Sequence, residues 1–371
     1  MVADFPVRFE LAHAMDIADV QEAWQELEVH AAPHFFLTWN WIGCWLAETS
    51  LRPLMLIGRA GDRIVLLGAL IPTTRRDVLP IAIHGLQLHT TGDMDRDVIT
   101  IEYNGFLVDL TWAGEIEANA IAFLLNGIHR CVELHLRNVP ASLDSAAHAS
   151  GFAVRELQRK PSWRIDLAAI RASGTPYLAS LSANTRQQIR RSMRLYEVHG
   201  PLTARAAEGL AEGMAFLDGL KELHQRQWTR RGEPGAFAYP FFESFQHRLI
   251  ESCLPQGTVE IVRVAAGPLV IGYIYNLIYN GHVSVYQTGF LYEADPRRKP
   301  GLVSHALCIQ GHLDAGSDVY DFMAGEARYK ANLGQPGPEM VYLLAQRSTW
   351  SIRLENTLRD VRRRLVRRQD A

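Results

Sequence analysis

Apolar and polar residues follow two different periods along this chain. Apolar positions that recur every three or four residues indicate amphipathic helices, whereas alternating or continuous apolar runs between turn residues indicate strands. In the first half, the helical period predicts helices at 16–29, 38–52, 115–126 and 143–150. Strand-like runs are predicted at 7–11, 54–59, 64–71 and 132–136, with further strand material up to residue 167.

The second half of the chain repeats this mixture of patterns. Helices are predicted at 184–199, 209–229, 240–253 and 301–314, with a terminal basic helix at 353–368. Strands are predicted at 258–265, 269–279, 282–290, 319–323 and 340–346. Each half thus combines antiparallel hairpins with a strand-helix-strand unit, which predicts an α/β (α+β) class with two similar domains. Each domain is expected to have a mixed, mostly antiparallel sheet flanked by helices.

A segment around residues 168–175 that contains glycine and serine separates the two halves. We place the domain boundary there, which gives domains 1–168 and 169–371. The length of 371 residues fits two domains, because a domain usually has ~100–200 residues.

Composition narrows the class of protein. Apolar residues make up 48% and charged residues 21% of the chain, which is enough for packed cores. The longest apolar run, 64–71, is far shorter than the ~20 residues that span a bilayer, and no signal peptide is recognisable, so we expect a cytoplasmic protein. A net charge of −2 gives no general attraction to DNA. Because no His-x-x-x-His motif or mixed His/Cys cluster stands out, we expect no metal site.

A basic loop before a helix is the first candidate for chemistry. Arg297, Arg298 and Lys299 precede Gly301, where the predicted helix begins. The free backbone N–H groups of a helix start, here from Gly301 to Ser304, bind anions such as a pyrophosphate. The alternative is a solvated basic loop in which Pro-Gly only marks the start of the helix.

A stripe of arginines is the second candidate. Arg186, Arg190 and Arg194 lie four residues apart on the predicted helix 184–199, with Arg191 beside them. The stripe is either a solvated face or a surface that recognises an anionic donor or acceptor. Because the centre of this helix has no aromatic residue on which bases would stack, we do not expect tRNA as the partner.

The basic loop and the segment after it resemble a known family. The spacing Arg298-x-x-Gly301-x-Val303 resembles the pyrophosphate loop Arg/Gln-x-x-Gly-x-Gly/Ala of GNAT acyltransferases, with Val303 in place of a small residue. Asp-Phe-Met-Ala-Gly-Glu-Ala-Arg-Tyr-Lys at 321–330 resembles the cellulose-biosynthesis-associated (CelD/BcsL-like) branch, which is related to the FemABX peptidoglycan aminoacyl transferases. The aromatic segment 35–45 and the basic segment 181–191 are similar to the same branch.

This resemblance implies two GNAT-like domains and direct transfer of an acyl group from acyl-CoA, such as acetyl-CoA, or from an acyl-carrier thioester, to an amine of a small molecule or saccharide. A bacterial role in exopolysaccharide, cellulose or cell-envelope metabolism is implied as well. Tyr329 would protonate the leaving thiolate, Lys330 would stabilise the oxyanion and Glu326 would act as general base. The candidate substrate-binding residues are Arg186, Arg190, Trp228, Tyr286 and Asp321.

Three alternatives stay open. The FemABX relationship also implies an aminoacyl-tRNA donor, and Val303 leaves room for a non-catalytic scaffold protein with a GNAT-like fold. Tyr329 and Lys330 would then be a partly buried aromatic residue and a surface lysine. The terminal basic helix, in which Leu354, Leu358, Val361 and Leu365 recur at helical spacing, either packs this apolar stripe on the domain or touches an anionic membrane as a peripheral contact. For Trp39, Trp41 and Trp45 we predict a place in the core.

Overall fold

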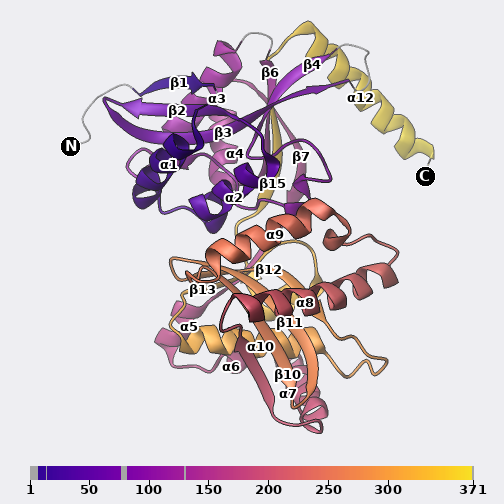
Figure 1. Ribbon diagram of the computed structural model, residues 1–371. Coiled ribbons are helices and arrows are strands. Elements are labelled where there is room, and N and C mark those ends of the chain that lie inside the picture. Colours follow the sequence, from indigo (N-terminus) through magenta and orange to yellow (C-terminus); the bar gives the residue numbers. More distant parts are fainter. Residues whose placement is uncertain (1–6, 14, 77–81, 129–130, 370–371) are drawn as a thin grey trace. The chain divides into compact units, whose positions relative to one another are not determined.

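The computed structural model describes residues 7–369 apart from 14, 77–81 and 129–130. The chain forms two compact units: unit 1 comprises Met1–Arg159 with Glu339–Ala371, and unit 2 comprises Lys160–Pro338. Figure 1 shows that the last segment, in yellow, returns to the elements of the N-terminal half. The predicted boundary at 168/169 therefore lies after the observed one at 159/160, and the assignment of residues 339–371 to the second domain is wrong. The strand and helix after residue 339 complete the first sheet and could not be assigned from local pattern alone.

Unit 1 is built on an eight-stranded sheet in the order β1-β2-β3-β4-β6-β15-β7, with β5 paired to β3. Its strands are β1 (Arg8–Ala12), β2 (Leu54–Ala60), β3 (Arg63–Arg75), β4 (Ile83–Leu88), β5 (Leu107–Val108), β6 (Cys131–Pro140), β7 (Ala153–Lys160) and β15 (Met340–Gln346). Its α-helices are α1 (Ile17–Ala31), α2 (Trp39–Thr49), α3 (Glu115–Gly127), α4 (Ala141–Ala149) and α12 (Trp350–Gln369).

Unit 2 is built on a seven-stranded sheet in the order β14-β8-β13-β12-β11-β10-β9. Its strands are β8 (Ser162–Asp166), β9 (Leu202–Ala206), β10 (Val259–Ala266), β11 (Leu269–Tyr279), β12 (His282–Phe290), β13 (Val319–Ala324) and β14 (Gln335–Pro336). Its α-helices are α5 (Leu167–Ser173), α6 (Tyr177–Ser180), α7 (Ala183–Glu197), α8 (Leu210–Arg230), α9 (Pro240–Cys253), α10 (Pro300–Asp314) and α11 (Arg328–Leu333).

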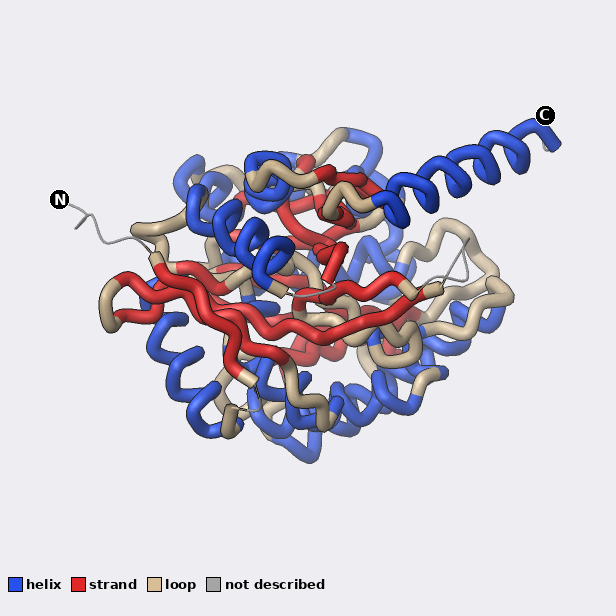
Figure 2. The backbone as a smooth tube through the Cα atoms, turned by 90° about the horizontal axis from the view of Figure 1, so that it is seen from above, coloured by secondary structure: helices blue, strands red, loops and turns tan. Residues whose placement is uncertain are grey.

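The two units share one plan. Each sheet has a parallel pair, β4 with β6 and β12 with β13, and the chain crosses between the two strands through a helix, α3 or α10. The pairs on either side of each parallel pair are antiparallel. Helices flank the strands on both sides (Figure 2). The predicted fold class, a mixed and mostly antiparallel sheet with flanking helices in each domain, is confirmed.

Four strands escaped the sequence analysis: β5 and β14 have only two residues each, and the longer β4 and β9 have a weak pattern. β4 lies in the middle of its sheet, yet it contains His84 and Gln87 among its six residues. Gln87 is buried and accepts a hydrogen bond from the hydroxyl of Thr90, so the sheet tolerates it. β9 is an edge strand with three exposed positions and gives no apolar run.

Buried tryptophans and a buried ion-pair network stabilise unit 1. Trp41 and Trp45 are in the core as predicted, whereas Trp39 is half-buried. α12 is attached to unit 1 through Arg75, which donates hydrogen bonds to the buried carboxylates of Glu133 and Glu355. A guanidinium between two buried carboxylates is a strong, directional link between a helix and a sheet.

The beginning of α12 differs from the predicted apolar stripe. Ile352 is buried, whereas of the predicted stripe residues Leu354 is exposed and Leu358 is half-buried, so the helix meets the unit in part through a residue that was not predicted. The predicted stripe residues Val361 and Leu365 have side chains outside the described part of the chain. Within the residues that the structure describes, no helix is both long and apolar enough to span a membrane.

Candidate active site

The parallel strands of unit 2 separate where α10 begins. β12 and β13 pair only from His282 opposite Val319 to Ser284 opposite Asp321. A register shift between β11 and β12 leaves Tyr286 as an extra residue on β12. Beyond Ser284, β12 runs on to Phe290 without pairing to β13. Separation of two parallel strands near their carboxyl ends leaves a gap in the sheet surface, which is where many α/β proteins bind ligands.

A cavity of about 420 Å³ lies at this end of β12. It is bounded by the end of β12, the start of α10, one side of α7 and one side of α11. The residues that line it are Asn184, Gln188, Phe290, Tyr292, Lys299, Gly301, Leu302, Arg328, Tyr329 and Asn332. The predicted residues Lys299, Gly301 and Tyr329 therefore meet in one cavity, although they come from two segments of the sequence.

The start of α10 presents backbone N–H groups to this cavity. The N–H of Lys299, which precedes the helix, donates to the buried hydroxyl of Ser192 at 2.8 Å, and Pro300 has no N–H. The next helical bond is that from Val303 to the carbonyl of Lys299. The N–H groups of Gly301 and Leu302 therefore need partners from outside the helix, and both residues line the cavity. No acidic residue lies in the first turn, so the positive end of the helix dipole stays available for an anion.

The side chain of Val303 does not obstruct this helix start. Val303 is fully buried and belongs to the hydrophobic core of unit 2. The bulky residue that departs from the family spacing thus points away from the cavity lining, and it gives no reason to expect a closed site.

The charges around the cavity differ from the predicted set. Arg297 forms an ion pair with Asp295, and Arg298 forms one with Glu293. Neither arginine lines the cavity. Among the residues that the structure describes, the ammonium of Lys299 and the guanidinium of Arg328 have no carboxylate partner. The two cations available to an anionic ligand are therefore Lys299, which was predicted, and Arg328, which was not.

Tyr329 is held in the cavity wall by aromatic packing. Its ring stacks on the imidazole of His305 with centroids 5.3 Å apart and planes inclined by 13°. Burial raises the pKa of the Tyr329 phenol well above its usual value near 10, so the group stays protonated at neutral pH. Burial, together with the nearby charge of Lys330, lowers the pKa of His305 to about 3 and keeps that ring neutral. A protonated phenol at the cavity wall can act as a proton donor.

Lys330 and Glu326 lie elsewhere. The ammonium of Lys330 donates to the carbonyl of Ala324 at 2.7 Å and to that of Met323 at 3.4 Å, at the end of β13. Met323 has a φ of 60°, a strained backbone conformation for a residue with a side chain, and Lys330 thus lies over an irregular strand end. Glu326 is exposed and does not line the cavity.

The remaining predicted residues do not gather at the cavity. Ser304 is buried in α10, and its hydroxyl has no hydrogen-bond partner among the described atoms. Arg186 donates to the carbonyls of Ala179 and Leu181 just before α7, whereas Arg190 is exposed on α7.

The three predicted substrate residues outside α7 are spread over three elements. Trp228 lies near the end of α8, with the guanidinium of Arg231 over its ring. Tyr286 accepts a hydrogen bond from Gln246 of α9. Asp321 is buried on β13, where it bonds to the imidazole of His282 and accepts the N–H of Met323. The structure therefore does not bring these three together with the cavity.

Sequence reasoning missed four polar residues of the lining. Asn184 and Gln188 lie one turn apart on α7, next to the predicted arginines, and Asn332 lies three residues after Tyr329. Arg328 directly precedes Tyr329 inside the family-like segment 321–330. In the sequence, these four residues are marked only by their closeness to predicted residues. Which neighbours face the cavity depends on how α7 and α11 are rotated about their axes, and the sequence alone does not give this rotation.

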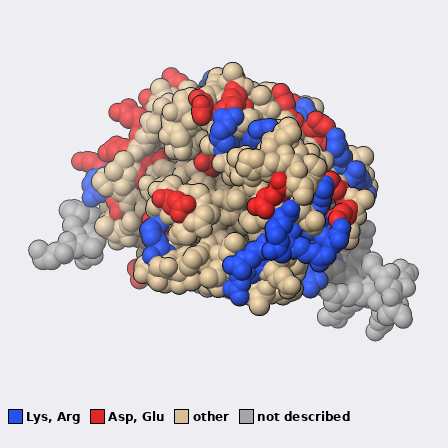
Figure 3. Space-filling model, turned by 90° about the horizontal axis from the view of Figure 1, so that it is seen from below, with Lys and Arg blue, Asp and Glu red and all other residues tan. Residues whose placement is uncertain are grey.

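The same region of the molecule carries a basic surface. Figure 3 views the side on which α7 lies in Figure 1 and shows Lys and Arg gathered in a band. On α7 the exposed arginines are Arg190, Arg191 and Arg194, and none of them has an acidic partner among the described residues. α7 therefore presents unneutralised positive charge beside the cavity that Asn184 and Gln188 line.

Comparison with protein families supports this reading of unit 2. Residues 183–331 match the family described as "Acetyltransferase (GNAT) domain". The matched stretch runs from the start of α7 to α11 and so includes all residues of the cavity except Asn332. Unit 2 has the GNAT fold. A search of curated proteins finds no match.

Solved structures with the same fold cover nearly the whole chain. The C-terminal domain of a protein described as a lysylphosphatidylglycerol synthetase from Agrobacterium fabrum aligns with a TM-score of 0.55 and 12% identity, over 90% of this chain and 93% of that chain. FemX aligns with 0.53 and 11%, over 91% and 95%. L-PGS from Bacillus licheniformis aligns with 0.51 and 10%, over 91% and 96%. At these identities the likeness concerns the fold alone, which is that of two GNAT-like domains.

The GNAT-like unit 1 has a different helix start at the corresponding place. α3 crosses from β4 to β6 as α10 crosses from β12 to β13, but Glu115 and Glu117 lie in its first turn. Carboxylates at a helix N-terminus neutralise the positive end of the helix dipole and repel a phosphate. Of these two corresponding helix starts, that of α10 is therefore the one suited to an anionic donor.

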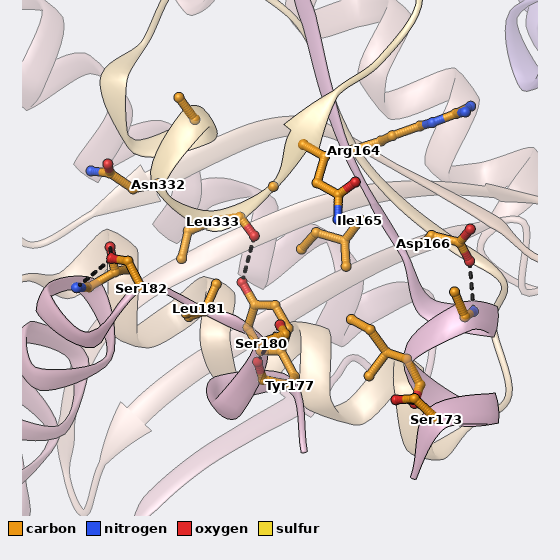
Figure 4. A pocket seen from close by; sticks show the side chains of 16 residues that line it. Arg164, Ile165, Asp166, Ser173, Tyr177, Ser180, Leu181, Ser182, Asn332 and Leu333 are labelled. Carbon is orange, nitrogen blue, oxygen red and sulfur yellow. Dashed lines mark hydrogen bonds between the residues drawn. The ribbon is translucent and has the colours of Figure 1, made fainter. Parts of the chain in front are cut away.

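A second cavity of about 460 Å³ lies beside β8, α5, α6 and α11 and shares Asn332 with the first (Figure 4). Several of its polar side chains are already engaged: the Tyr177 hydroxyl donates to the carbonyl of Leu333, Asp166 accepts the N–H of Ala169, and Ser182 accepts that of Thr185. Although it is larger, this cavity is the weaker candidate, because these groups serve the local structure.

Proposed function

We propose that unit 2 is an N-acyltransferase that moves an acyl group from acyl-CoA to an amine by direct transfer. The observation that carries the proposal is the free start of α10, where the amides of Gly301 and Leu302 and the cations Lys299 and Arg328 face the cavity that contains Tyr329. The match of residues 183–331 to the acetyltransferase (GNAT) domain supports it.

The donor binds through its pyrophosphate. Two backbone amides supply hydrogen bonds at the positive end of α10, and Lys299 and Arg328 neutralise the charge from two sides. The thioester then extends toward the place where β12 and β13 separate. The exposed arginines of α7 lie on the outer side of the same region and suit the further phosphate of a nucleotide.

Transfer then needs one proton donor in the cavity. The neutral amine attacks the thioester carbonyl carbon, the carbon–sulfur bond breaks, and the phenol of Tyr329 donates its proton to the departing thiolate. The proton released by the amine goes to water, and water returns one to the phenolate. Tyr329 can fill this role because it lines the cavity and its phenol, whose pKa is raised by burial, carries its proton at neutral pH. Fixing donor and acceptor side by side supplies much of the remaining acceleration.

The acceptor is an amine of a small molecule or saccharide in the cell envelope or in polysaccharide metabolism. One of the structurally similar proteins is described as a lysylphosphatidylglycerol synthetase, which agrees with an envelope role. The second candidate is an aminoacyl-tRNA donor, as the FemABX resemblance implies. The unneutralised arginines Arg190, Arg191 and Arg194 favour this candidate, because a nucleic-acid backbone would pair with them.

Calorimetry with acetyl-CoA and CoA tests the donor site. Lys299→Met and Arg328→Met are each expected to weaken CoA binding by roughly 10- to 150-fold, since hydrogen bonds to charged groups contribute about 1.5–3 kcal/mol. Arg297→Gln is the matched control from the same loop, because Arg297 pairs with Asp295 and lies outside the cavity lining. Equal affinity in all four proteins would refute the donor site.

The response to salt separates the two donors. A tRNA complex loses affinity steeply as salt rises, because each neutralised phosphate releases counterions. One outcome would show that the donor is aminoacyl-tRNA and not acyl-CoA. In that case the full-length protein binds tRNA but not CoA, and its affinity for tRNA depends steeply on salt, a dependence that Arg190→Gln and Arg191→Gln reduce. Binding of neither CoA nor tRNA would instead favour the scaffold alternative, in which the donor site is lost.

A further inference from the structure

The middle of α10 carries a cluster of side chains that the transfer reaction does not use. Cys308 and His312 lie four residues apart, so they occupy the same side of the helix. Glu260 of β10 and Asn276 of β11 face them from the sheet. The ligand atoms of Glu260, Cys308 and His312 all lie within 4.8 Å of one another.

The polar atoms of this cluster lie slightly closer together than, or as far apart as, the corners of a tetrahedral metal site. His312 Nε2 lies 3.1 Å from Glu260 Oε2. The amide nitrogen of Asn276 lies 2.8 Å from Glu260 Oε2, 3.5 Å from Cys308 Sγ and 3.3 Å from His312 Nε2. In a tetrahedral zinc site with bonds of about 2.0–2.3 Å, neighbouring ligand atoms are about 3.3–3.8 Å apart. Small movements would therefore let the four side chains surround one ion.

Protein groups alone leave this cluster unsatisfied. The amide nitrogen of Asn276 lies near Glu260 Oε2, Cys308 Sγ and His312 Nε2, whereas its Oδ1 is buried without a hydrogen-bond partner among the described atoms. A half-turn of the amide would put this oxygen at the fourth corner of the tetrahedron. A buried polar atom without a partner costs free energy, which a metal ion at the centre of the cluster would offset.

The imidazole of His312 is oriented as in a metal ligand. The hydroxyl of Ser317 lies 3.5 Å from His312 Nδ1, which leaves Nε2 directed at the cluster. Such an outer partner on the second nitrogen is typical of metal-binding histidines. Cys308, His312 and Asn276 are buried, while 23% of the Glu260 side chain is exposed and offers a path for the ion.

We propose that Glu260, Asn276, Cys308 and His312 bind one zinc ion that fastens α10 to β10 and β11. A thiolate, an imidazole and a carboxylate suit zinc and exclude magnesium and calcium, which take oxygen ligands. With four protein ligands the site is closed, as structural zinc sites are. The expectation of no metal site overlooked the spacing Cys308-x-x-x-His312 and could not foresee that two strands add ligands to it.

Metal analysis of the full-length, tag-free protein tests the site. After removal of metals and dialysis against zinc, the protein should retain one zinc per chain, with a melting temperature several degrees above that of the metal-free form. Cys308→Ser and His312→Gln should each lose the zinc, whereas Cys131→Ser, which changes an equally buried cysteine in unit 1, should keep it. Loading with cobalt instead should give a thiolate-to-cobalt charge-transfer band.

Two results would overturn the proposal. The first is that the folded wild-type protein retains no zinc and shows no charge-transfer band with cobalt; the four side chains would then form only an ion pair and hydrogen bonds. The second is that zinc stays bound after both substitutions. Should Cys308→Ser fail to fold, the cobalt spectrum of the wild-type protein still decides whether a thiolate binds the metal. None of these measurements needs an acyl donor, so they stand apart from the proposed reaction.

Discussion

Replacing Tyr329 by phenylalanine separates catalysis from structure at the cavity wall. The substitution removes only the phenolic hydroxyl, for which the structure gives no hydrogen-bond partner among the described residues, and leaves the ring to stack on His305 at 5.3 Å. Loss of an unpaired hydroxyl should change the free energy of unfolding by no more than about 0.5 kcal/mol. If Tyr329 protonates the leaving thiolate, the rate of acyl transfer should fall by roughly 100- to 10,000-fold.

The assay follows release of free CoA thiol, with a saturating amine acceptor, in the wild type and the Tyr329→Phe variant. Binding of CoA should be unchanged, because the amides of Gly301 and Leu302 and the charge of Lys299 are untouched. A reduced kcat with an unchanged melting temperature and an unchanged CoA affinity is the expected pattern. A variant with full turnover would refute the role of the phenol, and a variant with a much lower melting temperature would show that the hydroxyl serves the structure.

Two further predictions concern groups away from the cavity. Lys330→Met should lower the free energy of unfolding by about 1–3 kcal/mol, measured by denaturant titration, because its bonds to the carbonyls of Met323 and Ala324 are lost; an unchanged stability with a large loss of turnover would restore Lys330 as an oxyanion donor. Although burial opposes it, hydrogen bonds from His135 and Arg75 lower the pKa of Glu133 from 4.5 to about 2. Because this pKa is depressed in the folded state, its contribution to stability is present above about pH 5 and is lost as the pH falls toward 2. Glu133→Gln should therefore flatten the pH dependence of stability between pH 5 and pH 2, and a slope equal to that of the wild type would contradict the ion pair.

The sequence predicted most elements of the fold because their signals are local. The helix at 240–253 and the strands at 269–279, 282–290 and 340–346 agree with the structure at both ends. What failed depended on distant partners. Residues after 339 pair with β6 of unit 1, which no local pattern could reveal.

The candidate site was predicted in part for a similar reason. Lys299, Gly301 and Tyr329 belong to short segments with a recognisable order, and the fold brings them to one cavity. Arg297 and Arg298 lie in the same loop, but each is neutralised by an acidic residue of that loop, Asp295 or Glu293. Whether a loop arginine faces a ligand or a neighbouring carboxylate depends on the loop conformation, which composition does not determine.

The proposed donor site and the proposed zinc site lie on the same helix, α10. Its first turn carries the amides that bind the donor, and its core-facing side includes Val303. Cys308 lies seven positions after Gly301 in α10, which corresponds to about 10 Å along the helix axis. At that distance the zinc cluster cannot touch the pyrophosphate, yet it fixes the same helix against β10 and β11. Preorganised amides bind an anion more tightly than mobile ones, because less freedom is lost on binding. Loss of zinc is therefore expected to weaken donor binding without changing any residue that contacts the donor.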